Sequence, residues 1–120
     1  MTDTRTFTVL RDGDRDLTFE GVMLGEGRCG VGNSEQWTRG TDVSILKTTA
    51  GRYVVEVCQW DTSGDRRESN RAGVLNSASD VLQWLRDDCG NKLGPASKAA
   101  LQAAAKNDEG LATLVDETVE

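Results

Sequence analysis

The spacing of apolar residues changes once along this chain, and that change restricts its fold class. Up to Trp60, apolar side chains recur at every second position, as in "TFTVL" and "YVVEV", which is typical of strands with one buried face. From Asn76 onward they recur at the three- and four-residue intervals of amphipathic helices. We therefore expect a single α+β domain over residues 1–120, with an antiparallel sheet of four to five strands (two hairpins) followed by two to three short C-terminal helices.

Turn residues predict the two hairpins. The cluster "DGDRD" separates Thr6–Leu10 from Leu17–Leu24 and begins with Asp-Gly, a strong hairpin signal. "AGR" separates Thr41–Thr49 from Arg52–Trp60, with Gly51 supplying a positive φ. Both faces of the last run are at least partly apolar, so we expect one face to lie on helices and the other to be partly wet.

Polar segments divide the remaining elements. Asp61–Arg71 is polar and aperiodic, and we interpret it as an exposed loop before a short strand at Ala72–Leu75. The first helix carries Val81 and Leu85 on its apolar stripe, and Gly90 ends it. The expected helix starts are Ser77 or Ser79 with Asp80 in the first turn, then Gly94-Pro95, and then Asn107-Asp108 ahead of "EGLATLVDETVE".

The string "LGEGRCGVG" matches G-x-G-x-x-G, the pattern of dinucleotide-binding loops. In that motif the glycines open a helix whose N-terminus holds the pyrophosphate. The following "VGNSEQWTRGTD" has no helical stripe, so we interpret the string as a flexible connector between strands. The alternative is a small-ligand or nucleotide-binding loop over Gly25–Gly32. Its candidate binding residues are Gly25, Gly27, Arg28 and Gly30.

Composition removes most catalytic chemistry. The chain has no histidine, which excludes Ser-His-Asp and Cys-His nucleophile systems and most catalytic zinc sites. Cys29, Cys58 and Cys89 include no C-x-x-C pair, so neither a zinc site nor a disulfide framework is indicated, and a single pairing among them stays open. We expect a protein that is not an enzyme and that holds no metal or cofactor.

Charge and hydropathy restrict partners and location. The net charge of −6 argues against a nucleic-acid partner, because phosphate backbones attract basic surfaces. No signal peptide or bilayer-length apolar run is evident, so we expect a cytoplasmic location without membrane contact. An unpaired strand edge would leave a homodimer open.

Tryptophans and arginines are the candidate partner-binding residues. Trp37 and Trp60 fall near strand ends, and tryptophan is enriched at interface centres. Arg66, Arg67 and Arg71 form the densest positive group and are candidate partner-binding residues, although the acidic residues between them favour a solvated loop.

The order of these features resembles a known group. "FEGVMLGEG", a Trp-containing polar link, "VSILKTTAGRYVVEV", a polar loop, a Ser-Asp-started helix and an alanine-rich, acid-ended tail are similar to EXLDI-type and other small proteins of actinobacteria, their plasmids and phages. Members of that group usually carry an N-terminal ribbon-helix-helix segment, where this chain has a hairpin. The resemblance therefore implies no DNA binding, and it assigns no catalytic residues.

These observations favour one function over another. We expect a non-enzymatic protein-binding or regulatory accessory module, encoded by a phage or other mobile element and of a host-interaction or anti-defence type. The alternative is the small-ligand or nucleotide-binding domain that would use Gly25–Gly32.

Overall fold

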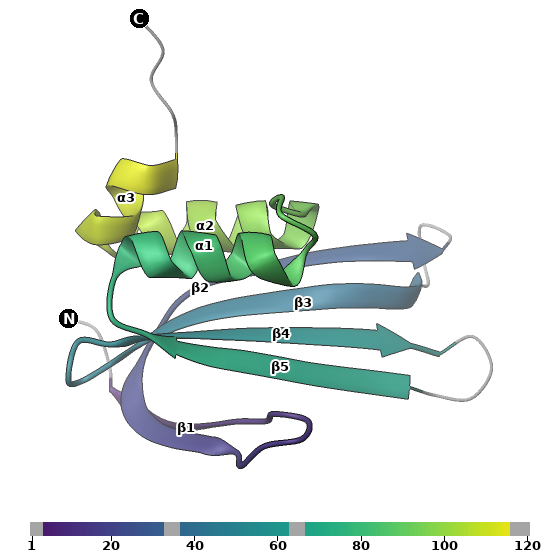
Figure 1. Ribbon diagram of the computed structural model, residues 1–120, viewed down its shortest axis with the longest axis horizontal. Coiled ribbons are helices and arrows are strands. Elements are labelled where there is room, and N and C mark those ends of the chain that lie inside the picture. Colours follow the sequence, from purple (N-terminus) through teal and green to yellow (C-terminus); the bar gives the residue numbers. More distant parts are fainter. Residues whose placement is uncertain (1–3, 33–36, 63–66, 116–120) are drawn as a thin grey trace, which may run out of the picture.

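The computed structural model describes residues 4–32, 37–62 and 67–115. Within these ranges the strands form one antiparallel sheet in the order β1-β2-β3-β4-β5, and the helices follow the sheet (Figure 1). The elements are β1 (Arg5–Val9), β2 (Leu17–Gly32), β3 (Trp37–Thr48), β4 (Tyr53–Asp61), β5 (Arg67–Leu75), α1 (Ala78–Asp88), α2 (Pro95–Ala105) and α3 (Glu109–Val115). The expected α+β class is confirmed.

Local signals start each helix where the sequence predicts. The backbone N–H of Asp80 donates to the Ser77 hydroxyl at 3.2 Å, which caps α1. Pro95 occupies the first position of α2, and the N–H of Leu111 donates to the Asp108 carboxylate at 3.1 Å to cap α3. Residues 116–120 of the predicted third helix lie outside the described residues. In the described ranges, none of the helices has the length and apolar content needed to cross a bilayer.

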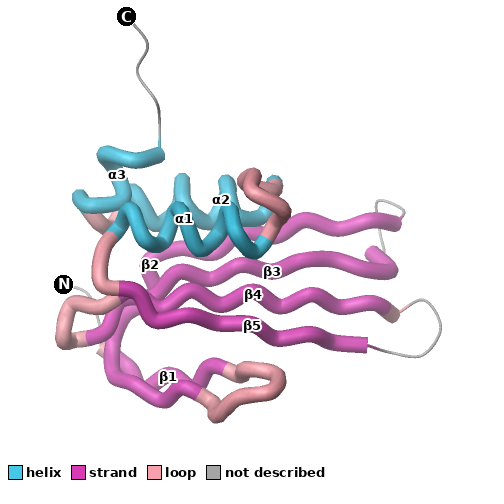
Figure 2. Tube along the Cα trace, viewed as in Figure 1, coloured by secondary structure: helices cyan, strands magenta, loops and turns pink. Residues whose placement is uncertain are grey.

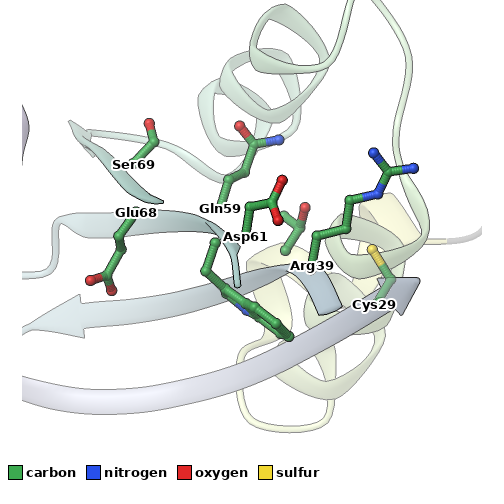
Figure 3. Close-up of a pocket in the computed structure, with 10 residues that line it drawn as sticks. Cys29, Arg39, Gln59, Asp61, Glu68 and Ser69 are labelled. Carbon is green, nitrogen blue, oxygen red and sulfur yellow. The ribbon is translucent and has the colours of Figure 1, made fainter. Parts of the chain in front are cut away.

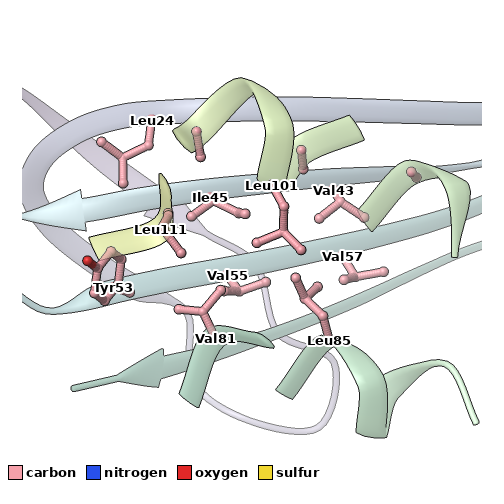
Figure 4. Packing of buried hydrophobic residues seen from close by; sticks show 13 residues of the cluster. Leu24, Val43, Ile45, Tyr53, Val55, Val57, Val81, Leu85, Leu101 and Leu111 are labelled. Atoms are coloured by element: carbon pink, nitrogen blue, oxygen red, sulfur yellow. The ribbon is translucent and has the colours of Figure 1, made fainter. Parts of the chain in front are cut away.

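α1 and α2 both lie on one face of the sheet, here called the helix face, with α2 over β2 and β3 and α1 over β4 and β5 (Figure 2). The main core lies between these helices and the central strands (Figure 4). Val43 and Ile45 of β3 and Val55 of β4 are at most 1 % exposed there. Around them the cluster contains Leu24, Tyr53, Val57, Val81, Leu85, Ala96, Ala100, Leu101, Ala104 and Leu111.

The β1–β2 hairpin curls across the opposite face, here called the far face (Figure 1). A second cluster forms beneath it, with Val9, Leu46 and Val54 buried. The tip of the hairpin reaches the other edge of the sheet, where the N–H of Asp12 donates to the Asn70 carbonyl at 2.8 Å and the Asn70 N–H donates to the Asp12 carboxylate at 2.9 Å. The hairpin leaves uncovered the part of the far face near the strand ends at Gly32, Trp37, Asp61 and Arg67, here called the distal end.

Two predicted connections are strands instead. The expected flexible connector at Gly25–Gly32 is the second half of β2, paired with β3 throughout, so the ligand-binding loop proposed there is wrong as a loop. Within the expected exposed loop Asp61–Arg71, Asp61 belongs to β4 and Arg67–Arg71 to β5, and residues 63–66 lie outside the described residues. In both segments the cross-strand ladder outweighs the weak local strand propensity of glycine and polar residues.

The glycines of the motif make room for α2. A Cβ on Gly25 would lie 2.3 Å from the Ala104 backbone nitrogen, and one on Gly27 would lie 2.1 Å from the Ala96 carbonyl oxygen. The helix backbone therefore rests on the strand backbone, which requires glycine below and favours alanine above. The spacing of Gly25 and Gly27 reflects the two-residue period of a strand, and it is not a phosphate-binding turn.

A β-bulge brings both halves of β2 into the core. The pairing with β3 shifts between Met23 and Gly25, so Leu24 is the extra residue. Leu24 is buried on the helix face, and its carbonyl accepts a hydrogen bond from the Asn107 side chain at 2.8 Å. The shift places Gly25 and Gly27 beneath α2, whereas Met23 packs into the far-face cluster.

Candidate functional site

The distal ends of four strands surround an open hollow of about 860 Å³, here called the distal hollow (Figure 3). These strand ends extend beyond the helices (Figure 1). The hollow is lined by Cys29, Gly30, Arg39, Gly40, Thr41, Gln59, Trp60, Asp61, Glu68 and Ser69.

The lining residues divide between the two faces, because neighbouring residues on a strand point to opposite sides. Figure 3 shows Glu68 directed away from the side that Ser69 occupies. Gly30, Gly40, Trp60 and Glu68 are successive cross-strand partners and form one row on the far face. In this row Trp60 supplies an aromatic side chain to the hollow.

Trp60 lies directly on a glycine. A Cβ on Gly40 would lie 2.6 Å from Cζ2 of the Trp60 indole, so the ring packs against the backbone of β3. The ring is only partly buried. Trp60 is thus a half-exposed aromatic on a rigid strand, which is the usual form of an interface anchor.

The other tryptophans are placed differently. Trp37 begins β3, but its side chain is outside the described set. Trp84 of α1 lies over Gly73 of β5, where a Cβ would be 2.5 Å from its indole nitrogen. Trp84 therefore packs the first helix onto the sheet.

Of the predicted arginine group Arg66, Arg67 and Arg71, the structure describes the side chain of Arg71. Arg66 and the side chain of Arg67 lie outside the described residues. Arg71 donates from Nε and Nη2 to the Asp88 carboxylate at 2.6 and 3.0 Å, and from Nη1 to Gln59 at 3.0 Å. The hydrogen bond to Asp88 raises the pKa of Arg71. Arg71 thus ties β5 to the end of α1.

Replacing Arg71 by methionine is expected to lower the free energy of unfolding by about 1–2 kcal/mol, because a two-pronged charged contact to a half-buried carboxylate is lost. Urea denaturation measures the change. Asp88→Asn should cost a similar amount, and the double variant should cost less than the sum of the two. Additive losses would contradict the assigned contact.

Carboxylates gather beside the hollow on the far face. The residues that line a second hollow of about 380 Å³ include Glu26, Asp42, Glu56, Glu68 and Arg28. The four carboxylates of this set are here called the acidic patch. Burial, and then the neighbouring Glu26 and Asp42, raise the pKa of Glu56 above its ordinary value. The four carboxylates of the acidic patch therefore carry more negative charge than Arg28 neutralises.

Arg28 lines the smaller hollow and forms an ion pair with Asp42. Its Nε donates to Asp42 at 3.1 Å across the β2–β3 ladder, and its side chain is 70 % exposed. This bond to Asp42 is the main cause that raises the pKa of Arg28. Of the predicted ligand residues, Gly27 and Arg28 line the smaller hollow and Gly30 the larger one, whereas Gly25 lies under α2.

Cys58 faces the acidic patch as a neutral thiol. Its Sγ donates to the Glu68 carboxylate at 3.3 Å. Burial, and then the bond to Glu68, raise the pKa of Cys58 to about 12. The described cysteines are unpaired.

Alkylation of Cys58 by iodoacetamide at pH 8 is expected to be about a hundredfold or more slower in the folded protein than in urea, because only the thiolate reacts. Mass spectrometry of the labelled peptides measures the rate. Glu68→Gln removes the charged acceptor and should speed the reaction, and equal rates before and after unfolding would disprove the raised pKa.

A buried polar cluster was not foreseen from the sequence. The Asp108 carboxylate, 6 % exposed, accepts from Lys47 Nζ at 2.7 Å and from the Tyr53 hydroxyl at 2.6 Å. Lys47 Nζ also lies 5.0 Å from the centre of the Tyr53 ring. Asp108 was predictable as a helix cap, but no local signal links it to residues of the β3–β4 hairpin. The cluster fastens α3 to the sheet.

In the described part of the chain, no three Cys, Asp or Glu side chains are grouped so that they could hold a metal ion. No family model matches the chain, and neither a curated protein nor a solved structure is significantly similar to it. The geometry of the distal hollow and the acidic patch therefore carries the functional argument.

Proposed function

We propose that this chain is a non-enzymatic protein-binding module that holds a basic segment of its partner against the distal end of the far face. The observation that carries the proposal is the half-exposed Trp60 on the Gly40 backbone, at the border of the acidic patch. An aromatic anchor beside unneutralised carboxylates suits a lysine- or arginine-bearing segment.

The surface is also suited to binding because it is rigid. Trp60, Glu56 and Glu68 project from strands that are paired with neighbours, so the backbone at these residues loses little conformational entropy when a partner binds. The net charge of −6 adds a long-range attraction to basic partners.

Catalysis has little support in the same surface. The chain has no histidine, and the thiol nearest to the patch, Cys58, has a pKa of about 12 and stays protonated at neutral pH. Cys58 therefore supplies no thiolate nucleophile to the acidic patch.

The test is capture of a partner on immobilised protein, followed by calorimetric titration of the purified partner. Trp60→Ala is expected to weaken binding by about 2 kcal/mol, as truncation of an aromatic anchor does. Glu56→Lys with Glu68→Lys should weaken it further. Glu109→Lys, an exposed charge reversal on α3, is the matched control and should leave affinity unchanged.

Two results would reject this proposal. One is a partner whose affinity is insensitive to Trp60→Ala and to both lysine variants while their melting temperatures match the wild type. The other is the absence of any stoichiometric partner.

A small-molecule role is the second candidate, favoured by the volume of the distal hollow, about 860 Å³, which lies within the range of ligand sites. A thermal-shift screen with nucleotides and metabolites distinguishes the two, since a ligand at a hundred times its Kd adds about 2.7 kcal/mol. A shift that Trp60→Ala abolishes would favour the ligand-binding role.

A further inference from the structure

The backbone of β2 has an outward row of polar groups in its second half. The Thr49 N–H donates to the Glu20 carbonyl on β2, and the Thr48 N–H donates to the Arg52 carbonyl next to β4. Along β3, odd-numbered residues therefore direct their backbone groups to β2 and even-numbered residues direct theirs to β4. Beyond the bulge, Gly27 is paired with Val43. Residues 25, 27 and 29 therefore direct their N–H and C=O groups to β3, and residues 26, 28 and 30 direct theirs away from the sheet.

On the outward side, β1 pairs with β2 only over Leu17–Gly21. The described residues provide no strand beside the backbone of Glu26, Arg28 and Gly30. The opposite edge differs, because Asp12 bonds both the N–H and the carbonyl of Asn70 on β5. The β5 edge is thus bridged at Asn70, whereas the second half of the β2 edge has no neighbouring strand among the described residues and is here called the open edge.

The second half of the β2 edge carries two charged side chains, Glu26 and Arg28, and follows the bulge at Leu24, but it lacks other common protections of an edge strand. Natural edge strands carry proline or lysine or are very short, which prevents pairing with other chains. Gly25–Gly32 contains neither proline nor lysine, and it continues a 16-residue strand.

α2 restricts what can occupy this edge. Its backbone rests directly on Gly25 and Gly27. A second copy paired symmetrically about Gly27 would bring its own α2 within one strand spacing, about 5 Å, of the first, whereas packed helices need about 8–10 Å. A strand without a covering helix avoids this clash.

We propose that the second half of the β2 edge accepts an extended segment of a partner protein as an added strand, with a lysine or arginine beside Glu26. This inference rests on the proposed protein-binding function and specifies how the partner is held. Main-chain hydrogen bonds to Glu26, Arg28 and Gly30 would supply affinity. The exposed Glu26 carboxylate, on the far face with the acidic patch, would select the basic side chain.

The test uses a displayed library of random linear peptides selected on the full chain, followed by synthesis of the enriched peptide. We expect enriched peptides to share a basic residue. On binding, amide hydrogen exchange should slow by about tenfold or more at Glu26, Arg28 and Gly30, and change little at Gly27 and Cys29, which already bond to β3.

Arg28→Pro removes one outward N–H without removing a bond to β3, and it should reduce peptide affinity about tenfold or more. Arg28→Ala removes the same side chain but keeps the N–H, so it is the reference against which the loss in Arg28→Pro is measured. Should Arg28→Pro fail to fold, the exchange pattern in the wild type decides.

The inference fails if no peptide is enriched, or if the free protein dimerises through this edge. It also fails if peptide binding slows amide exchange at other residues but not at Glu26, Arg28 and Gly30. Failure of the added-strand proposal can be distinguished from failure of the proposed protein-binding function. Loss of peptide binding in Trp60→Ala but not in Arg28→Pro would keep the proposed function and reject the added strand.

Discussion

Replacing Gly27 by valine is expected to lower the free energy of unfolding by about 3 kcal/mol or more. A Cβ at this position would lie 2.1 Å from the Ala96 carbonyl oxygen and 2.5 Å from the Ala100 nitrogen. Both are backbone atoms of α2, so no side-chain rotation relieves the overlap and the helix must move off the sheet. Urea denaturation followed by circular dichroism measures the loss.

The control is the neighbouring residue. Glu26 is exposed and points to the opposite face, so Glu26→Val should change stability by only about 0.5 kcal/mol. Trimming α2 with Ala99→Gly should not rescue Gly27→Val, because the main overlap is with backbone. A Gly27→Val protein as stable as the wild type would mean that α2 does not rest on β2.

Replacing Asp108 by alanine is expected to cost about 2–4 kcal/mol, because a helix cap and two charged hydrogen bonds are lost together and Lys47 keeps a half-buried charge. Asp108→Asn preserves the shape and the capping oxygen, and it should cost less. Glu109→Ala, exposed and next in the chain, is the matched control. Urea denaturation measures the losses, provided that the dependence of the unfolding free energy on urea concentration is the same for all variants. Equal stability of all three variants would contradict the cluster.

Acid should weaken the same cluster. Burial raises the pKa of Asp108, but hydrogen bonds from Lys47, Tyr53 and the Leu111 N–H outweigh it, so the pKa lies below its ordinary value. A lowered folded-state pKa means that the stabilisation is complete above about pH 4 and is lost as pH falls through the folded value. The stability difference between wild type and Asp108→Asn should therefore shrink at low pH. A difference that stayed constant from neutral to acid pH would disprove this coupling.

The candidate site was only partly predictable. The place of Trp60 near a strand end makes it a candidate interface residue, and in the structure Trp60 lines the distal hollow. Its support on Gly40 and the carboxylates of Asp42 and Glu56 were not identified, because the cross-strand register brings them together. The contact of Arg71 with Asp88 is not predictable from the sequence, since Asp88 lies on a helix that the sequence does not place beside β5.

The sequence by itself determined the elements whose hydrogen bonds are satisfied within a few residues. These include the turn at Gly51, the Ser77 cap and the cap at Asp108. Such signals are local because donor and acceptor are near neighbours in the chain.

Only the tertiary structure decided what the glycines of β2 do. The same spacing fits a phosphate-binding loop or a strand beneath a helix, and packing of the distant α2 selects the second. The bulge at Leu24 and the open edge likewise depend on register and on contacts across most of the chain. Those contacts form through close packing of backbones, which a local pattern of residue types does not encode.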